Sequence, residues 1–426
     1  MHAEDGAEMR VAWLTPLCEG TGVAKYSLAA VAAVRQRHDV DIWAEPARSY
    51  LLADGFSVLA ESAETVQALS AYDLIVFNLG NNAAFHATSF SLSFRLPGLV
   101  ILHDRVMQDL VFPYFVEVRR DPARYLALMA HYYGSPGMAY AIRRARGLAT
   151  VEHYDEFPLF EAVLANAAGV LAHSDEAAAL FERYPGVVPV GRANLLFSLY
   201  DDEVAARAPR SGSEPLSIVT HGNVVPSKRV ESLLSAYAAS PLLRGSSVVR
   251  VVGRMSEPYG STLRRYAETL GIAGSVTFTG AVDDQTMHRL LSEADIFVNL
   301  RHPSTEVASG ALVEQVRFAR PLVVSNVGFY AEVPDDVALK VDVADEVAQL
   351  TAALELLAGD ADLRERMSAA AMSFGLVAFS AEAYASAFDE IARRTATALP
   401  QVREARTEAR RRAARAPVVW PRDDVR

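Results

Sequence analysis

Apolar positions in the second half of the chain alternate between short continuous runs and stripes at helical spacing. The runs are strand-sized and are followed by glycine or polar residues. They cover Leu216–His221, Val248–Val252, Val276–Phe278, Ile296–Leu300 and Leu322–Ser325. Between them, apolar residues recur at i, i+3, i+4 and i+7, as on one face of a helix. The predicted helices carry Val230, Leu233, Leu234 and Tyr237, then Leu263, Tyr266, Ala267 and Leu270, then Met287, Leu290, Leu291 and Ala294, with a fourth over Gly310–Ala319.

The first half shows the same rhythm with longer interruptions. Its strand-sized runs cover Val11–Thr15, Val40–Trp43, Leu74–Asn78, Leu99–His103 and Gly169–His173. The interruption between His103 and Gly169 is mostly helical in pattern and rich in Tyr and Arg. The charged segment Asp201–Pro215 contains proline and glycine and is predicted to be a linker. Strands that alternate with helices predict parallel sheets covered on both faces.

We therefore expect an α/β protein with two Rossmann-like domains and a central cleft. The predicted N-terminal domain spans residues 1–205 and the C-terminal domain spans 206–380. A helix over 381–399 would pack back on the N-terminal domain, and an Arg-rich tail would follow at 400–426. Ligands of open parallel sheets bind beyond the carboxyl ends of the strands. The residues that follow each strand are therefore the candidates for a site.

Composition narrows the class of ligand and partner. The 426 residues are 51% hydrophobic and 22% charged, as in a folded protein, and the net charge is −11. No nucleic-acid partner is expected for so acidic a chain, and an anionic ligand must meet a local basic site. The one cysteine, Cys18, excludes an intrachain disulfide and suits a reducing compartment. We recognise no signal peptide and no run of the ~18 apolar residues that span a bilayer, so a cytoplasmic protein is expected.

A local basic site follows the strand predicted at 216–221. The run Gly222–Arg229 opens a helix, where free backbone N–H groups and the helix dipole favour an anion. Lys228 adds a positive charge at that point, and Arg229 could add another. The run lacks the second glycine and the Ser/Thr of a Walker loop. The alternative interpretation is a solvated basic turn.

A second loop of this kind runs from Glu306 to Glu314. Ser309 and Gly310 lie where the next helix begins, so free N–H groups there can hold a phosphate. Glu314, about one turn later, can accept two hydrogen bonds from a diol such as a ribose. Glu306 can orient sugar hydroxyls or stabilise positive charge at a reacting sugar carbon. Two unrelated surface glutamates are the alternative.

The first half offers weaker candidates. His103 ends a strand and could donate a hydrogen bond into the cleft or move a proton, or it could be purely structural. Gly20 and Gly22 follow the first strand and allow the backbone to approach a phosphate closely. A third glycine is missing, so a dehydrogenase is not expected. No His, Cys or Asp residues have metal-ligand spacing, so no metal is predicted, and Asp283 is expected to cap a helix.

Taken together, these segments resemble the GT-B glycosyltransferases of family GT4. The resemblance covers nearly the whole chain up to about Leu399 and depends on the order and spacing of several motifs. The motifs are Pro16–Gly22, Leu102–Asp104, His173-Ser174, Gly222–Arg229, Phe278–Gly280, Pro303–Glu314 and Arg320–Ser325. Within them, the two glutamates separated by seven residues are the signature of the family.

The resemblance implies a retaining hexosyltransferase that uses a nucleotide diphosphate sugar and needs no metal or other cofactor. It implies that Lys228 binds the diphosphate, that Glu314 holds the ribose and that Glu306 contacts the donor sugar. His103 would lie by the sugar and the acceptor. The remaining implied donor contacts are Gly20 and Gly22 over the diphosphate, Ala308, Ser309, Gly310 and Ala311 near sugar and phosphate, and Ala281 and Val282 along the base.

Two departures from the family pattern affect the donor site. Asn223 stands where many members have an arginine, so a charge is missing that Arg229 or Arg254 could replace. The usual Gly-Phe-Gly between the glutamates is Val307–Gly310, which keeps only the second glycine. The backbone can still approach the donor, but the identity of the sugar stays open.

The expected partners are a nucleotide sugar donor and an acceptor that is a glycan, a lipid-linked sugar or a small molecule, as in polysaccharide biosynthesis. The Arg/Tyr-rich insert and the Arg-rich tail could make peripheral contact with anionic lipid at the inner face of a membrane, or could be exposed solvated surfaces. Alternatives on the same architecture are a sugar-nucleotide epimerase, a phosphorylase and a non-catalytic partner subunit. The intact Lys228, Glu306 and Glu314 favour an enzyme.

Overall fold

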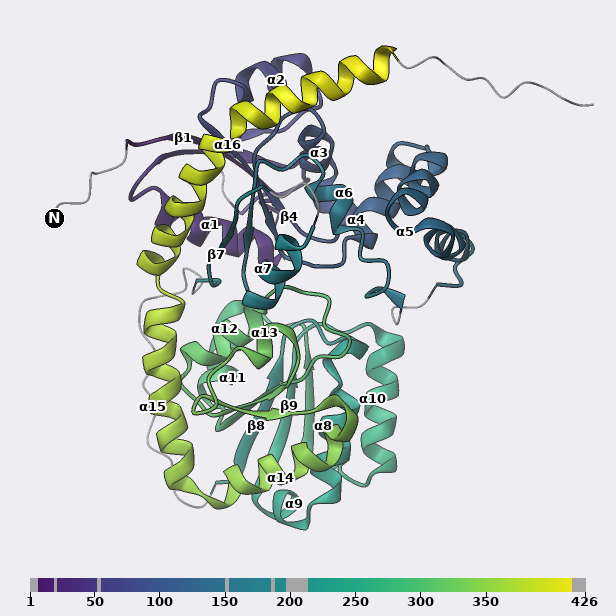
Figure 1. Cartoon of the computed structure of the whole chain (residues 1–426). Helices are drawn as coiled ribbons and strands as arrows, with labels where there is room; N and C mark the ends of the chain where they lie inside the picture. The colour runs from purple at the N-terminus through teal and green to yellow at the C-terminus, as the bar shows by residue number, and fades with distance from the viewer. Residues whose placement is uncertain are drawn as a thin grey trace, which may run out of the picture.

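The computed structural model describes residues 7–18, 21–51, 55–149, 153–184, 188–196 and 214–415, with side chains through residue 408. Within these ranges, two parallel sheets lie one above the other, each flanked by helices (Figure 1). The α/β architecture with two domains is therefore as predicted. The predicted linker at 201–215 lies outside the described residues except for Glu214 and Pro215.

The N-terminal domain is built on a sheet with the order β3-β2-β1-β4-β5-β6-β7 in the described residues. Its strands are β1 (Arg10–Thr15), β2 (Asp39–Ala44), β3 (Phe56–Val58), β4 (Leu74–Leu79), β5 (Leu99–Leu102), β6 (Gly169–Ala172) and β7 (Val190–Arg192). Its helices are α1 (Gly22–Val34), α2 (Ala63–Leu69), α3 (Ala83–Ser93), α4 (Gln108–Pro113), α5 (Pro122–Ala145), α6 (Phe160–Leu164) and α7 (Asp175–Glu182), with a π-helical turn η1 (Tyr114–Val118).

The C-terminal domain is built on a sheet with the order β10-β9-β8-β11-β12-β13 in the described residues. Its strands are β8 (Leu216–His221), β9 (Ser247–Val252), β10 (Val276–Gly280), β11 (Ile296–Asn299), β12 (Leu322–Ser325) and β13 (Ala338–Val341). Its helices are α8 (Val230–Ala239), α9 (Pro241–Ser246), α10 (Glu257–Thr269), α11 (Asp284–Ser292), α12 (Gly310–Arg317), α13 (Gly328–Ala331), α14 (Glu346–Gly359) and α15 (Ala361–Ala378). Short 3-10 turns are η3 (Pro226–Lys228), η4 (Ala273–Ser275) and η5 (Val343–Asp345).

Each strand predicted from the hydrophobic runs is present, and three short strands were not predicted. β3 and β7 have three residues each, which is too short to show a period. β13 carries a lysine, Lys340, in a run of four. Asp283 caps α11 as expected, since its carboxylate accepts a hydrogen bond of 2.7 Å from the Thr286 N–H.

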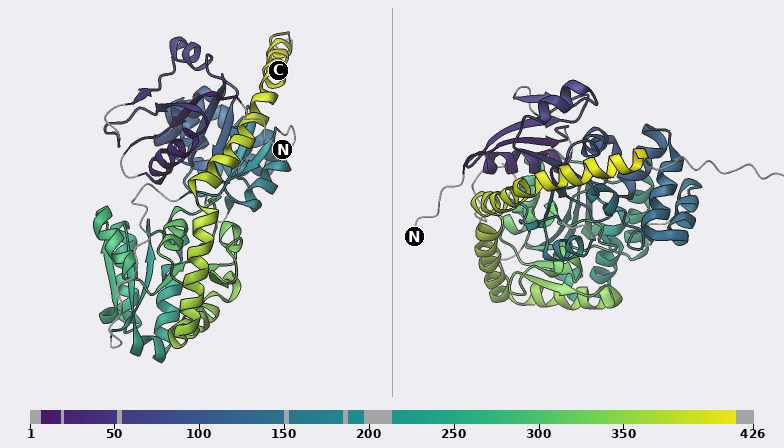
Figure 2. Two further views of the ribbon diagram at one scale, coloured as in Figure 1. Left: turned by 90° about the vertical axis from the view of Figure 1, so that its left-hand side faces the viewer. Right: turned by 45° about the horizontal axis from the view of Figure 1, so that its top comes forward.

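The chain returns to the N-terminal domain at its end. α15 runs along the C-terminal domain, and α16 (Ala381–Arg415) crosses the N-terminal domain (Figures 1 and 2). α16 contacts α1, β6 and β7, and it continues without interruption across the predicted boundary at residue 399 to Arg415. Glycines permit the close approach: a Cβ on Gly169 would lie 1.9 Å from Thr395 Oγ1, and one on Gly191 would lie 2.6 Å from Ile391 Cβ.

Candidate active site

The carboxyl ends of the strands in both sheets face the junction of the two domains, where a short antiparallel contact joins them. Asp104, after β5, forms an isolated bridge with Glu306 of the C-terminal domain. The Arg105 N–H donates to the Thr305 carbonyl at 2.9 Å, and the Val307 N–H donates to the His103 carbonyl at 3.1 Å. Val307 is 2% exposed and packs in the hydrophobic core of the N-terminal domain. This contact brings the predicted residues His103 and Glu306 to the same place.

The loop after β8 folds around Lys228. Gly222 has φ of 110°, a conformation that only glycine adopts readily. A Cβ on Gly222 would lie 3.3 Å from Lys228 Nζ and 3.8 Å from Ala311 Cβ, so this loop faces the first turn of α12. Ser309 caps α12 by accepting a hydrogen bond of 3.3 Å from the Leu312 N–H. The lysine and the free N–H groups of a helix start therefore converge, which is a suitable environment for a phosphate.

Lys228 is buried, at 5% exposure, and its ammonium donates to the His221 carbonyl at 2.9 Å. Burial and, to a smaller extent, the nearby Arg301 lower the pKa of Lys228 to about 7, against the opposite effect of Glu306 and Glu314. A buried ammonium whose direct partner is a neutral carbonyl gains most from an added anion. This electrostatic environment favours binding of a diphosphate.

Glu314 is oriented by a hydrogen-bonded chain. Asn299 donates to the Gln315 carbonyl oxygen at 2.9 Å, and the Gln315 amide lies 3.2 Å from His221 Nδ1. An amide N–H donates, so His221 Nδ1 accepts and Nε2 carries the proton that bonds Glu314 at 2.9 Å. Burial raises the pKa of Glu314, but the contact with His221 outweighs it, and the net shift is downward. A charged carboxylate held in this way can accept hydrogen bonds from a ribose diol.

Glu306 is held by two partners that the sequence prediction did not identify. Arg301 binds its carboxylate with two hydrogen bonds of 3.0 and 3.1 Å, and the Tyr330 hydroxyl also donates to it. The side chain of Glu306 is 23% exposed and that of Arg301 is 11% exposed. Glu306 thus lies at the domain junction as predicted, but as one half of an ion pair. Arg301 could have been predicted from the sequence as a candidate, because it is a polar residue that follows β11 at the end of the strand where ligands are expected.

His103 is neutral and fixed in orientation. Its Nε2 lies 2.6 Å from the Asn78 carbonyl oxygen, while the Asn78 amide donates to Thr15 and Ser27 at 3.0 and 2.8 Å. The ring packs edge-on against Tyr26, with centroids 4.8 Å apart. Burial, followed by the influence of His173 and His86, holds the pKa of His103 well below its usual value. The ring can therefore position a substrate without carrying a charge.

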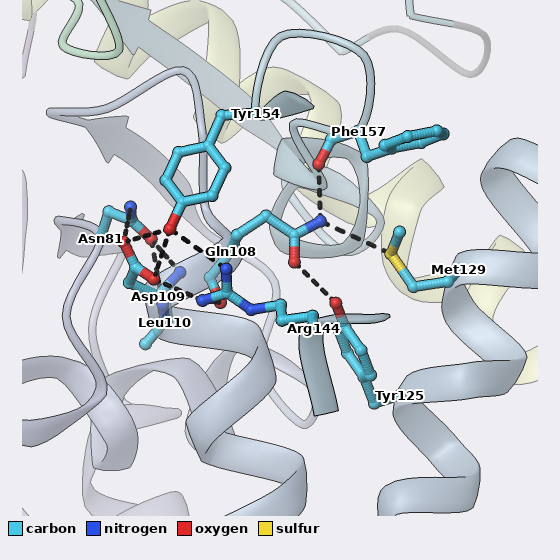
Figure 3. A network of polar contacts seen from close by, with 9 residues as sticks. All are labelled: Asn81, Gln108, Asp109, Leu110, Tyr125, Met129, Arg144, Tyr154 and Phe157. Atoms are coloured by element: carbon cyan, nitrogen blue, oxygen red, sulfur yellow. Dashed lines mark hydrogen bonds and ion pairs between the residues drawn. The ribbon is translucent and has the colours of Figure 1, made fainter. Parts of the chain in front are cut away.

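Asp104, the neighbour of His103, was not among the predicted site residues. The Asn81 N–H donates to its carboxylate at 2.9 Å, and burial raises its pKa to about 7. Asn81 belongs to a polar network in which its carbonyl oxygen accepts from the N–H groups of Asp109 and Leu110 at 2.7 and 3.0 Å (Figure 3). This network links the start of α4 to the loop after β4 and so fixes the N–H group that holds Asp104.

The same network anchors the helical insert. Arg144 of α5 pairs with Asp109, which also accepts from the Tyr154 hydroxyl at 3.2 Å (Figure 3). The Arg144 guanidinium lies over the rings of Phe112 and Tyr154, 5.0 and 5.5 Å from their centroids. Arg144 and Tyr154 thus join the insert to α4, whereas Arg143 and Arg146 at the end of α5 are exposed.

One other predicted donor residue, Arg229, points away from Lys228. Arg229, with φ of 53°, directs its guanidinium to Glu346 at 2.9 Å, so it does not join Lys228. Asn223 and Arg254 are exposed. Gly20 lies outside the described residues, whereas Gly22 is the first residue of α1.

The remaining predicted contacts lie around the junction. Lys25 of α1 forms an ion pair of 2.9 Å with Asp284 of α11, and both influence Glu314 electrostatically. Val282 and Ala308 are partly buried, and Gly310 is exposed at the start of α12. Among the described residues, no group of three or more His, Cys, Asp or Glu side chains could hold a metal ion. None of the helices described there is long and apolar enough to cross a membrane.

Comparison with known proteins agrees with this geometry. Residues 201–374 match the family model described as "Glycosyl transferases group 1". No curated protein matches the chain in sequence. Solved structures resemble the chain over most of its length, and at identities below a fifth they establish the fold.

Three of these structures illustrate the likeness. Anabaena Alr3699/HepE, in complex with UDP and glucose, is 17% identical over 90% of this chain and 99% of that chain, with a TM-score of 0.63. The sucrose-phosphate synthase of Thermosynechococcus elongatus is 15% identical over 91% and 98%, with a TM-score of 0.60. WaaG, a glycosyltransferase involved in lipopolysaccharide biosynthesis, is 16% identical over 89% and 99%, with a TM-score of 0.56.

Proposed function

We propose that this chain with the GT-B fold is a glycosyltransferase, and that it moves a hexose from a nucleotide diphosphate sugar to an acceptor hydroxyl with retention of anomeric configuration. One observation carries the proposal: buried Lys228 and the first turn of α12 converge at the domain junction, one helical turn from the oriented Glu314. Leaving diphosphate, ribose and sugar each have a suitable partner there.

In the proposed reaction, the bond between the sugar carbon and the diphosphate oxygen breaks, and the acceptor oxygen bonds to that carbon. The acceptor hydroxyl passes its proton to the departing phosphate oxygen. Lys228 and the N–H groups at Gly310 stabilise the developing negative charge, because they are already oriented before reaction. Arg301 and Tyr330 hold Glu306 by the sugar, and His103 faces the sugar and the acceptor. The charges come from protein groups, so we propose that no metal is required.

The nucleotide and the sugar of the donor are to be identified by experiment. UDP and glucose accompany Alr3699/HepE, which makes UDP-glucose the first donor to test. The acceptor is a glycan, a lipid-linked sugar or a small molecule, and WaaG, which acts in lipopolysaccharide biosynthesis, makes polysaccharide assembly the first context to examine. A thermal-shift screen against nucleotide sugars would identify the donor, because a ligand that binds only the folded state raises the apparent stability.

Lys228→Ala tests the assignment. We expect turnover at saturating donor to fall by on the order of 100- to 1000-fold, as when one charge-stabilising group is removed from an active site. Turnover is measured as nucleoside diphosphate released in the presence of acceptor, with and without EDTA. Arg244→Ala is the matched control, since it removes an exposed cation of α9 in the same domain.

The outcomes separate this reaction from others on the fold. Full turnover of Lys228→Ala would refute the role of Lys228. Conversion of the sugar nucleotide into an isomer without acceptor indicates an epimerase, and dependence on free phosphate indicates a phosphorylase. Donor binding without any turnover indicates a partner subunit. Retention is read from the anomeric proton coupling of the product by NMR, and loss of turnover in EDTA would refute metal independence.

A further inference from the structure

The donor site needs a second cation near Lys228, and the residues expected to supply it do not. Asn223, directly after Gly222, is neutral and exposed. Arg229 pairs with Glu346, whose carboxyl group is itself buried. Arg254 is exposed, and although its carbonyl accepts a hydrogen bond of 2.8 Å from the Val224 N–H, its side chain makes no hydrogen bond to the Lys228 loop within the described residues. A diphosphate leaving group carries more charge than Lys228 alone can offset.

Arg301 brings a guanidinium to this place from a different strand. It follows β11, is 9% exposed, and its Nη1 donates to Ser227 Oγ at 3.0 Å, beside Lys228. Its backbone N–H is fixed by Ser325 Oγ at 2.9 Å. Arg301 is also the nearby cation that acts on the pKa of Lys228. The two positive groups therefore share one site, although they are 73 positions apart in sequence.

The guanidinium has hydrogen-bonding capacity to spare. It has five N–H donors in a fixed plane. Two of them bind Glu306 and one binds Ser227. Within the described residues, this leaves two N–H donors for a ligand, next to a lysine whose ammonium donates to a neutral carbonyl. A planar cation with paired N–H groups is well suited to phosphate oxygens.

We propose that Arg301 is the second diphosphate-binding cation of the donor site, taking the part that the neutral Asn223 leaves unfilled, with Glu306 as its counter-ion. Arg301 thus binds the donor's phosphate directly and couples it to the glutamate beside the sugar. This inference rests on the proposed function, because it assumes a nucleotide diphosphate sugar as donor.

Binding of free nucleotides tests the assignment separately from transfer. UDP, GDP and ADP are titrated calorimetrically into the full chain, and the tightest is compared with its own monophosphate. We expect Arg301→Gln to weaken diphosphate binding by about 10- to 100-fold, because it removes one charged hydrogen-bonding group. Monophosphate binding should weaken by less than about threefold. Equal weakening of both, or of neither, would overturn the proposal.

A relocated charge provides the matched variant. Asn223→Arg in the Arg301→Gln background places a cation on the loop after Gly222, and we expect it to recover at least about tenfold of the lost diphosphate affinity. No recovery would mean that Arg301 acts through local structure and not through its charge. Arg244→Gln, which removes an exposed cation of α9, should leave both affinities unchanged.

Glu306→Gln distinguishes a phosphate-binding arginine from one that only holds the glutamate. The substitution releases the guanidinium from its counter-ion, so we expect diphosphate affinity to stay equal or to rise. A loss of about tenfold or more relative to the wild type would show that the ion pair is structural. This measurement decides the question even if Arg301→Gln fails to fold. Failure of the wild type to bind any nucleotide diphosphate or its sugar would instead refute the proposed function.

Discussion

At the scale of single residues, Lys228 sets the pH dependence of the donor site. Burial is the main reason that the pKa of Lys228 in the folded protein is lowered to about 7 from its usual 10.5. The neutral form therefore stabilises the folded state fully above the pKa of the unfolded chain. This stabilisation is lost progressively as the pH falls toward about 7. A bound diphosphate reverses this effect by raising the pKa. We expect nucleotide diphosphate binding at pH 8 to take up close to one proton, and affinity to fall about tenfold per pH unit above 7.

Calorimetric titration in two buffers of different ionisation enthalpy measures this proton uptake. Lys228→Arg should bind without uptake, because an arginine stays charged. Asp104 has a pKa of about 7 as well, raised by burial, so Asp104→Asn serves as the control and should keep the uptake. Binding to the wild type at pH 8 with no proton uptake would contradict the assignment to Lys228.

At the scale of elements, the ends of β8 and β9 meet through two glycines. Gly253 has φ of 132°, and a Cβ there would lie 1.9 Å from the Gly222 carbonyl oxygen. We expect Gly253→Ala to lower the free energy of unfolding by about 1–3 kcal/mol through backbone strain, and to displace the loop that holds Lys228. Urea unfolding followed by circular dichroism measures the first effect, and nucleotide diphosphate affinity measures the second.

Gly245 provides the matched control for this substitution. It lies in α9, and a Cβ added to it would have no neighbouring atom within 4 Å. Gly245→Ala should therefore raise the free energy of unfolding by about 0.5–1 kcal/mol, as expected for alanine in a helix. Equal effects of the two substitutions would show that the close approach at Gly253 does not matter.

At the scale of the whole molecule, α16 near the end of the chain packs against α1 near its start. The hydroxyls of Tyr26 in α1 and Tyr384 in α16 form a hydrogen bond, and the Tyr26 ring contacts the His103 ring. Tyr384→Phe leaves one buried hydroxyl without its partner, so we expect a loss of about 1–2 kcal/mol in the free energy of unfolding. The double variant Tyr26→Phe/Tyr384→Phe removes both hydroxyls and should be less destabilised than the single one. Chemical denaturation of the three proteins tests this order, and a double variant that loses the sum of two single losses would contradict it.

Features that depend on interactions between residues close in sequence could be predicted, whereas features that depend on distant residues could not. The strand before Gly222 and the helix after Ser309 were predicted because periodicity, glycine positions and caps act over a few residues. Arg229 was expected beside Lys228 because they are adjacent in sequence. The structure separates them, since a left-handed backbone at Arg229 turns its side chain toward Glu346. Arg301 was missed because its role depends on a partner from another strand.

The sequence by itself determined the alternation of strands and helices, the two sheets, and the placement of Lys228, Glu306 and Glu314 after strand ends. These features depend on the spacing of residues within each segment, so they do not require knowledge of where the segment lies in the fold. Only the tertiary structure decided that residues 103–105 pair with 305–307, that Arg301 binds Glu306 beside Lys228, and that α16 packs against the N-terminal domain through α1, β6 and β7. Such contacts join segments that are far apart in the chain, and their geometry depends on the packing of the whole molecule and not on any local pattern.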